Sequence, residues 1–175
     1  MSRIRIIPTL VVIVITLSIL FGGWAVYKNF GLEHPAEQAL KQVPSVQSVK
    51  VMISNQNRTV KVTVWNVQDL QSTYHKIKQV VLQSLGSDTQ IQVVDTRSEA
   101  LAHLYQTLQP VLYEGIHKGN YTEMIQTIES RAKQANVVAN VSMDSANVYI
   151  QLTQDSHQLD DIIPYNNQQQ GVNPS

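Results

Sequence analysis

The densest group of polar side chains lies near the C-terminal end of the sequence, in Asp155-Ser156-His157 and Asp160-Asp161. Carboxylate oxygens of this kind could bind a hard cation. Closely spaced carboxylates do not by themselves fix a coordination geometry, however, and the same residues are typical of a solvated turn followed by a helix start. We favour the turn and helix, and expect His157 and Asp160 to be solvated and to form no metal site.

No other combination of residues matches a catalytic or metal-binding pattern. The chain has no cysteine, which excludes thiolate catalysis and Cys-ligated zinc. The sequence contains no H-E-x-x-H pair, no G-x-S-x-G elbow and no Gly-rich phosphate loop. No two of the five histidines stand at i and i+4: His34, His75, His103, His117 and His157. We therefore predict no catalytic, cofactor-binding or metal-binding residues, no cofactor, and no enzymatic activity.

Three tyrosines, Tyr105, Tyr113 and Tyr121, recur at a spacing of eight residues. The last two flank the stretch from Gly115 to Gly119, where we expect glycine to loosen the chain. An aromatic strip beside such a loop could face a small ligand, whereas packing in or around the core is the usual role of tyrosine. Ligand binding at this loop is the alternative to a purely structural role.

The charges of the chain give no indication of a nucleic-acid partner. Lysine and arginine number 13, and aspartate and glutamate also number 13, so the formal net charge is zero. From Asn29 onward, 10 basic residues stand against 13 acidic ones, and a mildly acidic domain does not favour binding to phosphate or anionic lipid. We therefore predict that the chain does not bind nucleic acid.

A long apolar segment follows the first few residues. From Ile6 to Val26 the sequence carries no charge, and these 21 residues meet the length of about 20 that a membrane-spanning helix needs. The hydroxyls of Thr16 and Ser18 can bond back to the helix backbone, which makes them tolerable in lipid. We predict a transmembrane anchor over residues 6–27, embedded in the lipid bilayer.

Basic residues flank this segment unequally. Arg3 and Arg5 precede it, whereas Lys28 is the basic residue that closely follows it. The positive-inside rule then places residues 1–5 in the cytoplasm and the C-terminal domain outside it, at the cell membrane. A signal peptide cleaved near Gly23-Trp24-Ala25 is the competing interpretation, but cleavable apolar regions are usually shorter.

A linker over residues 28–34 leads into an αββαβ module that we expect at residues 35–95. Two alternating runs, from Val49 to Ile53 and from Val60 to Val64, predict a β-hairpin with one buried and one wet face. Helical spacing of apolar residues before and after this hairpin predicts two helices, and Ile91 begins a third strand.

The second half, residues 96–165, should contain a helical segment and a second helix–hairpin unit. Pro110 should kink or break the first of its two helices. Alternation from Val137 to Val141 and from Val148 to Leu152 predicts the second hairpin. The tail at residues 166–175 is polar and rich in Gln and Asn, and should be disordered. The predicted fold class is α+β, with helix-covered antiparallel hairpins in the order αββαβ and then ααββ.

The two predicted hairpins correspond to each other in sequence. A shift of 88 positions lays the apolar residues of the first onto those of the second, and Leu40 of the preceding helix onto Ile128. Such a correspondence suggests a degenerate internal duplication. The alternative is that any two hairpins with short connections align in this way, because alternation with a period of two carries little information.

The stretch from Pro35 to Asp95, with its valine-rich hairpin followed by a helix and a strand, resembles the small αββα(β) modules of bacterial envelope proteins. These include the ring-building motifs of membrane-anchored secretion and sporulation-channel components, and sporulation lipoproteins. The chain departs from the lipoproteins in having no cysteine for a lipid anchor. The resemblance implies lateral assembly rather than catalysis, and it carries over no site residues.

These features lead us to expect a non-enzymatic, membrane-anchored envelope protein whose extracytoplasmic domain contacts a protein partner or another copy of itself. The alternative is an extracytoplasmic sensor that binds a small ligand at the loop between Tyr113 and Tyr121. The folded surface separates the two hypotheses. An open sheet edge favours assembly, and a deep pocket with converging polar groups favours ligand binding.

Overall fold

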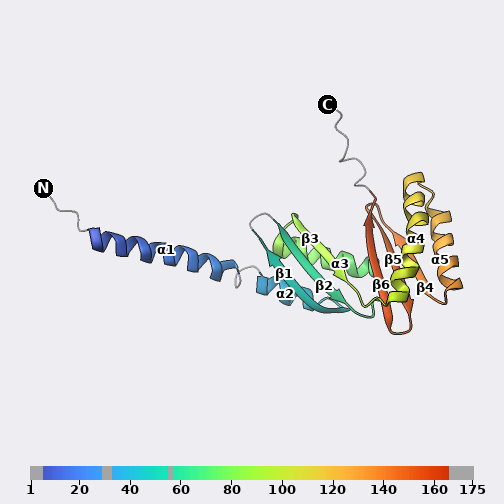
Figure 1. Cartoon of the computed structure of the whole chain (residues 1–175), viewed down its shortest axis with the longest axis horizontal. Coiled ribbons are helices and arrows are strands. Elements are labelled where there is room, and N and C mark those ends of the chain that lie inside the picture. The colour runs from blue at the N-terminus through green and yellow to red at the C-terminus, as the bar shows by residue number, and fades with distance from the viewer. Residues whose placement is uncertain (1–5, 29–32, 55–56, 166–175) are drawn as a thin grey trace, which may run out of the picture.

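The described residues form an α+β fold with five helices and two three-stranded sheets (Figure 1). This computed structural model describes the backbone of residues 6–28, 33–54 and 57–165. The predicted α+β class is confirmed. The expected cytoplasmic N-terminus at residues 1–5 and the expected disordered tail at residues 166–175 lie outside the described residues.

The N-terminal apolar segment forms a helix, α1 (Ile6–Lys28), which extends away from the two sheets (Figure 1). Its large apolar side chains between Leu10 and Phe21 are exposed. The hydroxyls of Thr16 and Ser18 each donate to the backbone oxygen four residues earlier, at 2.8 Å. This confirms the back-bonding that the sequence predicted for them.

Within the described part of the chain, no helix is long and apolar enough to cross a membrane. The anchor expected over residues 6–27 extends on both sides beyond the side chains described in α1, which run from Leu10 to Gly23. The anchor therefore stays a prediction.

The first module comprises two helices and three strands: α2 (His34–Lys41), β1 (Val46–Ile53), β2 (Arg58–Val64), α3 (Leu70–Leu85) and β3 (Thr89–Val94). Strands β1 and β2 form the predicted antiparallel hairpin, and β2 pairs with β3 in parallel. Parallel pairing requires a crossover connection, which α3 provides. The αββαβ order predicted for residues 35–95 agrees with this arrangement.

One face of the first sheet forms a core with α2 and α3. Val60, Val62 and Val64 of β2 are each at most 1% exposed, and they belong to one apolar cluster with Leu40 of α2 and Ile77 of α3. The alternate residues of the hairpin are at least partly exposed, and all of them except Met52 are polar. The buried and wet faces predicted for this hairpin are both confirmed.

The second module comprises two helices and three strands: α4 (Glu99–Lys118), α5 (Tyr121–Gln134), β4 (Val138–Met143), β5 (Asn147–Gln154) and β6 (His157–Pro164). The strands form an antiparallel sheet in the order β4-β5-β6. Val148, Ile150 and Leu152 of β5 are fully buried in one cluster with apolar residues of α4 and α5. The predicted second hairpin therefore gains a third strand.

Strand β6 corrects the sequence prediction, which placed a solvated turn and a helix start at Asp155–Asp161. Asp155 does sit in a tight turn, with a φ of 53°, but a strand follows it. Gln158 and Asp160 are only 7% and 3% exposed, so the prediction of a solvated Asp160 was wrong. Alternation fails to reveal this strand because its buried positions include polar side chains that bond to the first module.

Helix α4 runs without a break through Pro110, so the predicted break was wrong, whereas a kink at this residue stays a prediction. Pro110 lies on the exposed side of the helix, where the carbonyl it leaves unpaired can bond to water. Gly115 also lies within α4 and faces α5, where an added Cβ would meet the Cβ of Met124 at 2.5 Å. Gly119 adopts a left-handed conformation and caps the helix. The loop expected between Tyr113 and Tyr121 is therefore mostly helix.

The registers of the two hairpins differ from the proposed correspondence. Val51 pairs with Val60 in the first hairpin, and Val141 pairs with Ile150 in the second. The hairpins correspond with a shift of 90 positions, so the shift of 88 was wrong. The third strands also differ, since β3 is parallel to β2 whereas β6 is antiparallel to β5. Duplication stays a prediction.

Strand β5 is buried on both faces along its first six residues. Ile150 and its alternate neighbours pack under α4 and α5, whereas Tyr149 joins the apolar core of the first module. Gln151 is 6% exposed and bonds to the backbone of the first module. The second face of β5 is therefore covered by the first module rather than by solvent, and β5 connects the two modules.

Candidate functional site

The edge strands of the two sheets approach each other at the junction of the modules. Strand β3 is at the edge of the first sheet and β6 is at the edge of the second. Thr96 N donates to Gln158 O at 3.2 Å, and Asp160 N donates to Asp95 Oδ2 at 2.8 Å. From this contact the two strands diverge (Figure 1).

A groove with a cavity volume of about 360 Å³ lies between the diverging strands. We call it the β3–β6 groove. Its lining comprises residues 91–93 of β3, residues 160–162 and Pro164 of β6, and the side chains of Tyr74, Arg97 and Asn147. The lining residues come from five separate parts of the chain and include both polar and apolar side chains.

Asp160 is the most buried charged side chain of the groove, at 3% exposure. Its Oδ1 accepts hydrogen bonds from Gln158 Nε2 at 3.0 Å and from Gln151 Nε2 at 3.2 Å. Burial raises the pKa of Asp160 to about 6, although the two amide bonds act in the opposite direction. At neutral pH this carboxylate is therefore mostly ionised in a site that disfavours its charge.

The second oxygen of Asp160, Oδ2, has no hydrogen-bond donor among the described residues. Every fully buried side-chain nitrogen or oxygen in the described part of the chain does have a partner. Oδ2 is therefore not fully buried. Since Asp160 lines the β3–β6 groove, this oxygen is accessible to a group bound in the groove. The groove thus contains an acceptor without a protein donor.

The two glutamines also connect the second module to the first. The side-chain amides of Gln151 and Gln158 donate to Val67 O at 2.8 and 3.1 Å, and Val67 N donates to Gln158 Oε1 at 3.2 Å. Val67 lies in the connection between β2 and α3. These bonds hold the floor of the groove in place, because they fix β5 and β6 against the first module.

Two further carboxylates stand beside Asp160. Asp95 accepts a bidentate pair from Arg97, with Nε at 2.8 Å and Nη2 at 2.7 Å. Asp161 accepts a hydrogen bond from the hydroxyl of Tyr105. Burial, together with this bond, raises the pKa of Tyr105 far above its usual value, so the phenol stays protonated. Within the described residues, Arg97 thus neutralises Asp95, and no cation pairs with Asp160 or Asp161.

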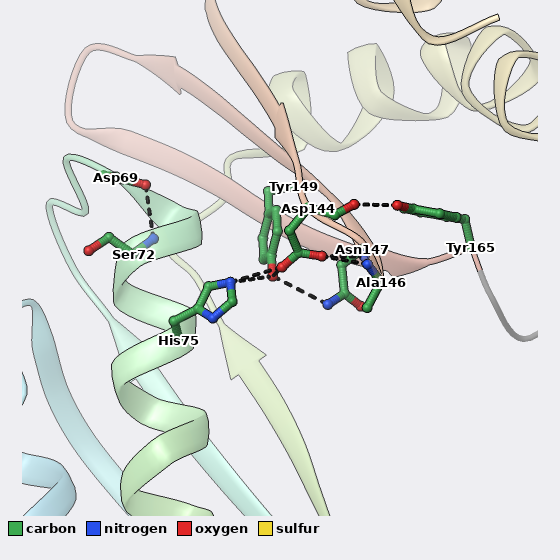
Figure 2. Close-up of polar contacts among 8 residues, drawn as sticks. All are labelled: Asp69, Ser72, His75, Asp144, Ala146, Asn147, Tyr149 and Tyr165. Atoms are coloured by element: carbon green, nitrogen blue, oxygen red, sulfur yellow. Dashed lines mark hydrogen bonds and ion pairs between the residues drawn. The ribbon is translucent and has the colours of Figure 1, made fainter. Parts of the chain in front are cut away.

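A second polar cluster lies between α3 and the turn that joins β4 to β5 (Figure 2). Asp144 Oδ2 contacts His75 Nε2 at 2.8 Å and accepts from the hydroxyl of Tyr149 at 2.6 Å. Asp144 Oδ1 accepts from the backbone N–H groups of Ala146 and Asn147 at 2.7 and 2.8 Å. The carboxylate of Asp144 is therefore bonded on both oxygens. We call this group the Asp144 cluster.

The ionisation of the Asp144 cluster indicates a structural role. Burial acts to raise the pKa of Asp144, but the four hydrogen bonds outweigh it and hold that pKa well below its usual range. Burial and the bond to Asp144 raise the pKa of Tyr149, so this phenol is no nucleophile at neutral pH. The cluster joins α3 to the second sheet.

The residues singled out in the sequence do not assemble into one site. Asp155 and His157 are exposed at the turn between β5 and β6, apart from the buried Asp160. Tyr113 is exposed, and Tyr121 packs against Tyr165 with ring centroids 5.7 Å apart. In the described part of the chain, no group of three or more acidic, His or Cys side chains is arranged to hold a metal ion.

Sequence reasoning missed both the β3–β6 groove and the Asp144 cluster. His75 and Asp144 are 69 residues apart, and Val67 and Gln158 are 91 apart. Each contributing segment looks like ordinary helix, strand or turn, so no local spacing reveals these contacts. The one available signal was a polar run, Asp160-Asp161, inside a stretch with apolar neighbours.

Comparisons of the chain with protein-family models, with curated proteins and with solved structures found no match. The resemblance to bacterial envelope modules therefore stays a prediction.

Proposed function

We propose that this chain is a non-enzymatic, membrane-anchored protein of the bacterial cell envelope whose extracytoplasmic domain docks a protein partner. The observation that carries the proposal is the β3–β6 groove, where the edges of two sheets face each other. An unpaired strand edge presents a row of backbone donors and acceptors, and such edges are common sites of protein association. The groove offers two of them to one ligand.

The anchor is supported by the surface of α1. Its described apolar side chains are exposed on all sides of the helix, and the polar hydroxyls of Thr16 and Ser18 are bonded internally. A surface of this kind is costly in water and suits a bilayer. Proteins extracted from native membranes should therefore begin before Gly22. An N-terminus at Val26 would show that the segment is a cleaved signal peptide.

A small cationic ligand in the same groove is a second candidate. The cavity of about 360 Å³ falls within the usual range of roughly 300–1,000 Å³ for ligand sites. Asp160 and Asp161 supply unneutralised carboxylates for a cation. In this form the sensor hypothesis does not involve Tyr113 or Tyr121, because neither residue lines the β3–β6 groove that contains Asp160 and Asp161.

Site-specific photo-cross-linking in native membranes tests the docking proposal. A photoreactive amino acid at Gln92, which lines the groove, should give a protein adduct of defined mass. The matched control is Lys50, an exposed residue on the same open sheet but two strands away. No adduct at Gln92, or the same adduct at both positions, contradicts docking in the groove.

A further inference from the structure

We propose that the β3–β6 groove accepts an extended segment of the partner as an added β-strand, with a lysine or arginine of that segment placed against Asp160. This inference rests on the proposed docking function and specifies the chemistry of the partner. It combines three observations: the directions of the two strand edges, the charges between them, and the free oxygen of Asp160.

The two strand edges fix how a segment can enter. Thr96 contacts Gln158, and Asp95 contacts Asp160. Residue numbers therefore decrease along the β3 side of the contact while they increase along the β6 side. Strands β3 and β6 are therefore antiparallel across the groove. A strand between them runs parallel to one and antiparallel to the other, and it joins the two sheets into a single continuous sheet. Both edges then obtain backbone partners.

The charges of the groove specify the side chain. Two carboxylates of the lining, Asp160 and Asp161, stand beside one guanidinium, Arg97, and Arg97 is already paired with Asp95, which lies outside the lining. Asp160 is 97% buried as a residue, given its 3% exposure, yet its Oδ2 has no donor in the described structure. An ammonium or guanidinium group supplies the missing donor and neutralises the buried charge in one contact.

Neither the C-terminal tail nor a described strand supplies a suitable occupant. Residues 166–175 contain no lysine or arginine, and the proposed membrane anchor separates Arg3 and Arg5 from the groove. A strand already in a sheet cannot serve, because a segment between β3 and β6 needs both edges free and each described strand is paired on at least one side. We therefore assign the occupant to another protein, as an extended basic segment.

A library of random linear peptides, selected against the full chain in lipid nanodiscs, tests this inference. Selected peptides should carry a lysine or arginine flanked by β-branched residues. Each lysine peptide should bind at least about tenfold more tightly than its glutamate counterpart, a difference of about 1.4 kcal/mol. Methylation of alternate backbone nitrogens should abolish binding, because it removes the donors that a strand contributes to a sheet.

Two variants separate the groove from the rest of the surface. Asp160→Asn keeps the shape of the side chain and removes its charge, so it should erase the preference for lysine. Asp88→Asn, at an exposed carboxylate outside the groove lining, should leave binding unchanged. Selection of acidic or uncharged peptides, or equal affinity in Asp160→Asn, overturns the inference, as does tight binding by the backbone-methylated peptides.

The outcomes also separate this inference from the docking proposal. A defined adduct at Gln92 together with peptides that lack a basic residue retains docking and rejects the basic strand. Tight binding of spermidine, but of no peptide, favours the small-ligand hypothesis and rejects both. Increased peptide affinity after removal of residues 166–175 identifies those residues as an occupant and contradicts assignment to a partner alone.

Discussion

Replacing Asp160 with asparagine should make the protein more stable at neutral pH. Asp160 is 3% exposed, and its burial raises its pKa from the ordinary value of 3.8 to about 6. In the unfolded chain the carboxyl returns to an ordinary pKa of about 3.9. A rise of about two units at about 1.4 kcal/mol per unit corresponds to about 3 kcal/mol of stability lost when the group ionises.

The pH dependence follows from the sign of this shift. Below about pH 4, Asp160 is protonated in both the folded and unfolded states, and its ionisation costs nothing. As the pH rises from about 4 to 6, the unfolded state releases its proton first and stability falls. The stability gain in Asp160→Asn should therefore be near zero below pH 4 and reach about 3 kcal/mol above pH 6. The two amide bonds to Oδ1 are retained, because asparagine keeps that acceptor.

Urea unfolding of the full chain in a mild detergent, followed by near-ultraviolet circular dichroism, measures this difference at several pH values. The control variant is Asp88→Asn, whose carboxylate is exposed and should show no comparable gain. A loss of stability in Asp160→Asn at pH 7, or a gain that does not change with pH, refutes the reasoning. Either result would mean that the charge of Asp160 supports the fold.

Three further substitutions test other parts of the structure by thermal unfolding. Gly115→Ala should cost about 1–3 kcal/mol, because the added methyl group overlaps Met124 and cores tolerate overpacking poorly; an unchanged melting temperature contradicts the close approach of α4 and α5. Asp144→Asn should lower the free energy of unfolding by roughly 2 kcal/mol at pH 7. This loss should shrink as the pH falls below about 4, because the lowered pKa of Asp144 stabilises the fold only while the carboxylate is ionised. A loss that does not change with pH contradicts this role of the Asp144 charge. Ile150→Asp should prevent stable folding, since it buries an unpaired carboxylate at a position with 0% exposure. A melting temperature equal to that of the wild type would show that Ile150 does not face the core.

The local elements of the fold were predictable because their signals are local. Alternation placed Val60 and Val62 on the buried face of a hairpin, and the helical spacing of apolar residues placed α3. The start of α4 is set by a cap, because the side chain of Ser98 accepts a hydrogen bond from Leu101 N at 3.2 Å.

The errors arose where a tertiary contact outweighs the local signal. A polar pair such as Gln158 and Asp160 indicates solvent in isolation, but here each side chain finds a buried partner in the other module. Pro110 usually interrupts a helix, but Leu108 and Leu112 on either side of it are fully buried and hold the turn together. The groove was not predictable, since its two walls belong to sheets whose relative placement no local pattern encodes.

The position of β5 has a consequence for the order of folding. Tyr149 contributes to the core of the first module, and Val67 of that module bonds to Gln158, 91 residues further along. A chain that emerges from the N-terminal end can form the hairpin of the first module early, but that module cannot close its core until β5 and β6 have arrived. Contacts of such long sequence separation form late and slowly. A premature stop anywhere before β5 should therefore leave both modules open to proteases, and the amides of both should exchange with solvent in a single cooperative unit.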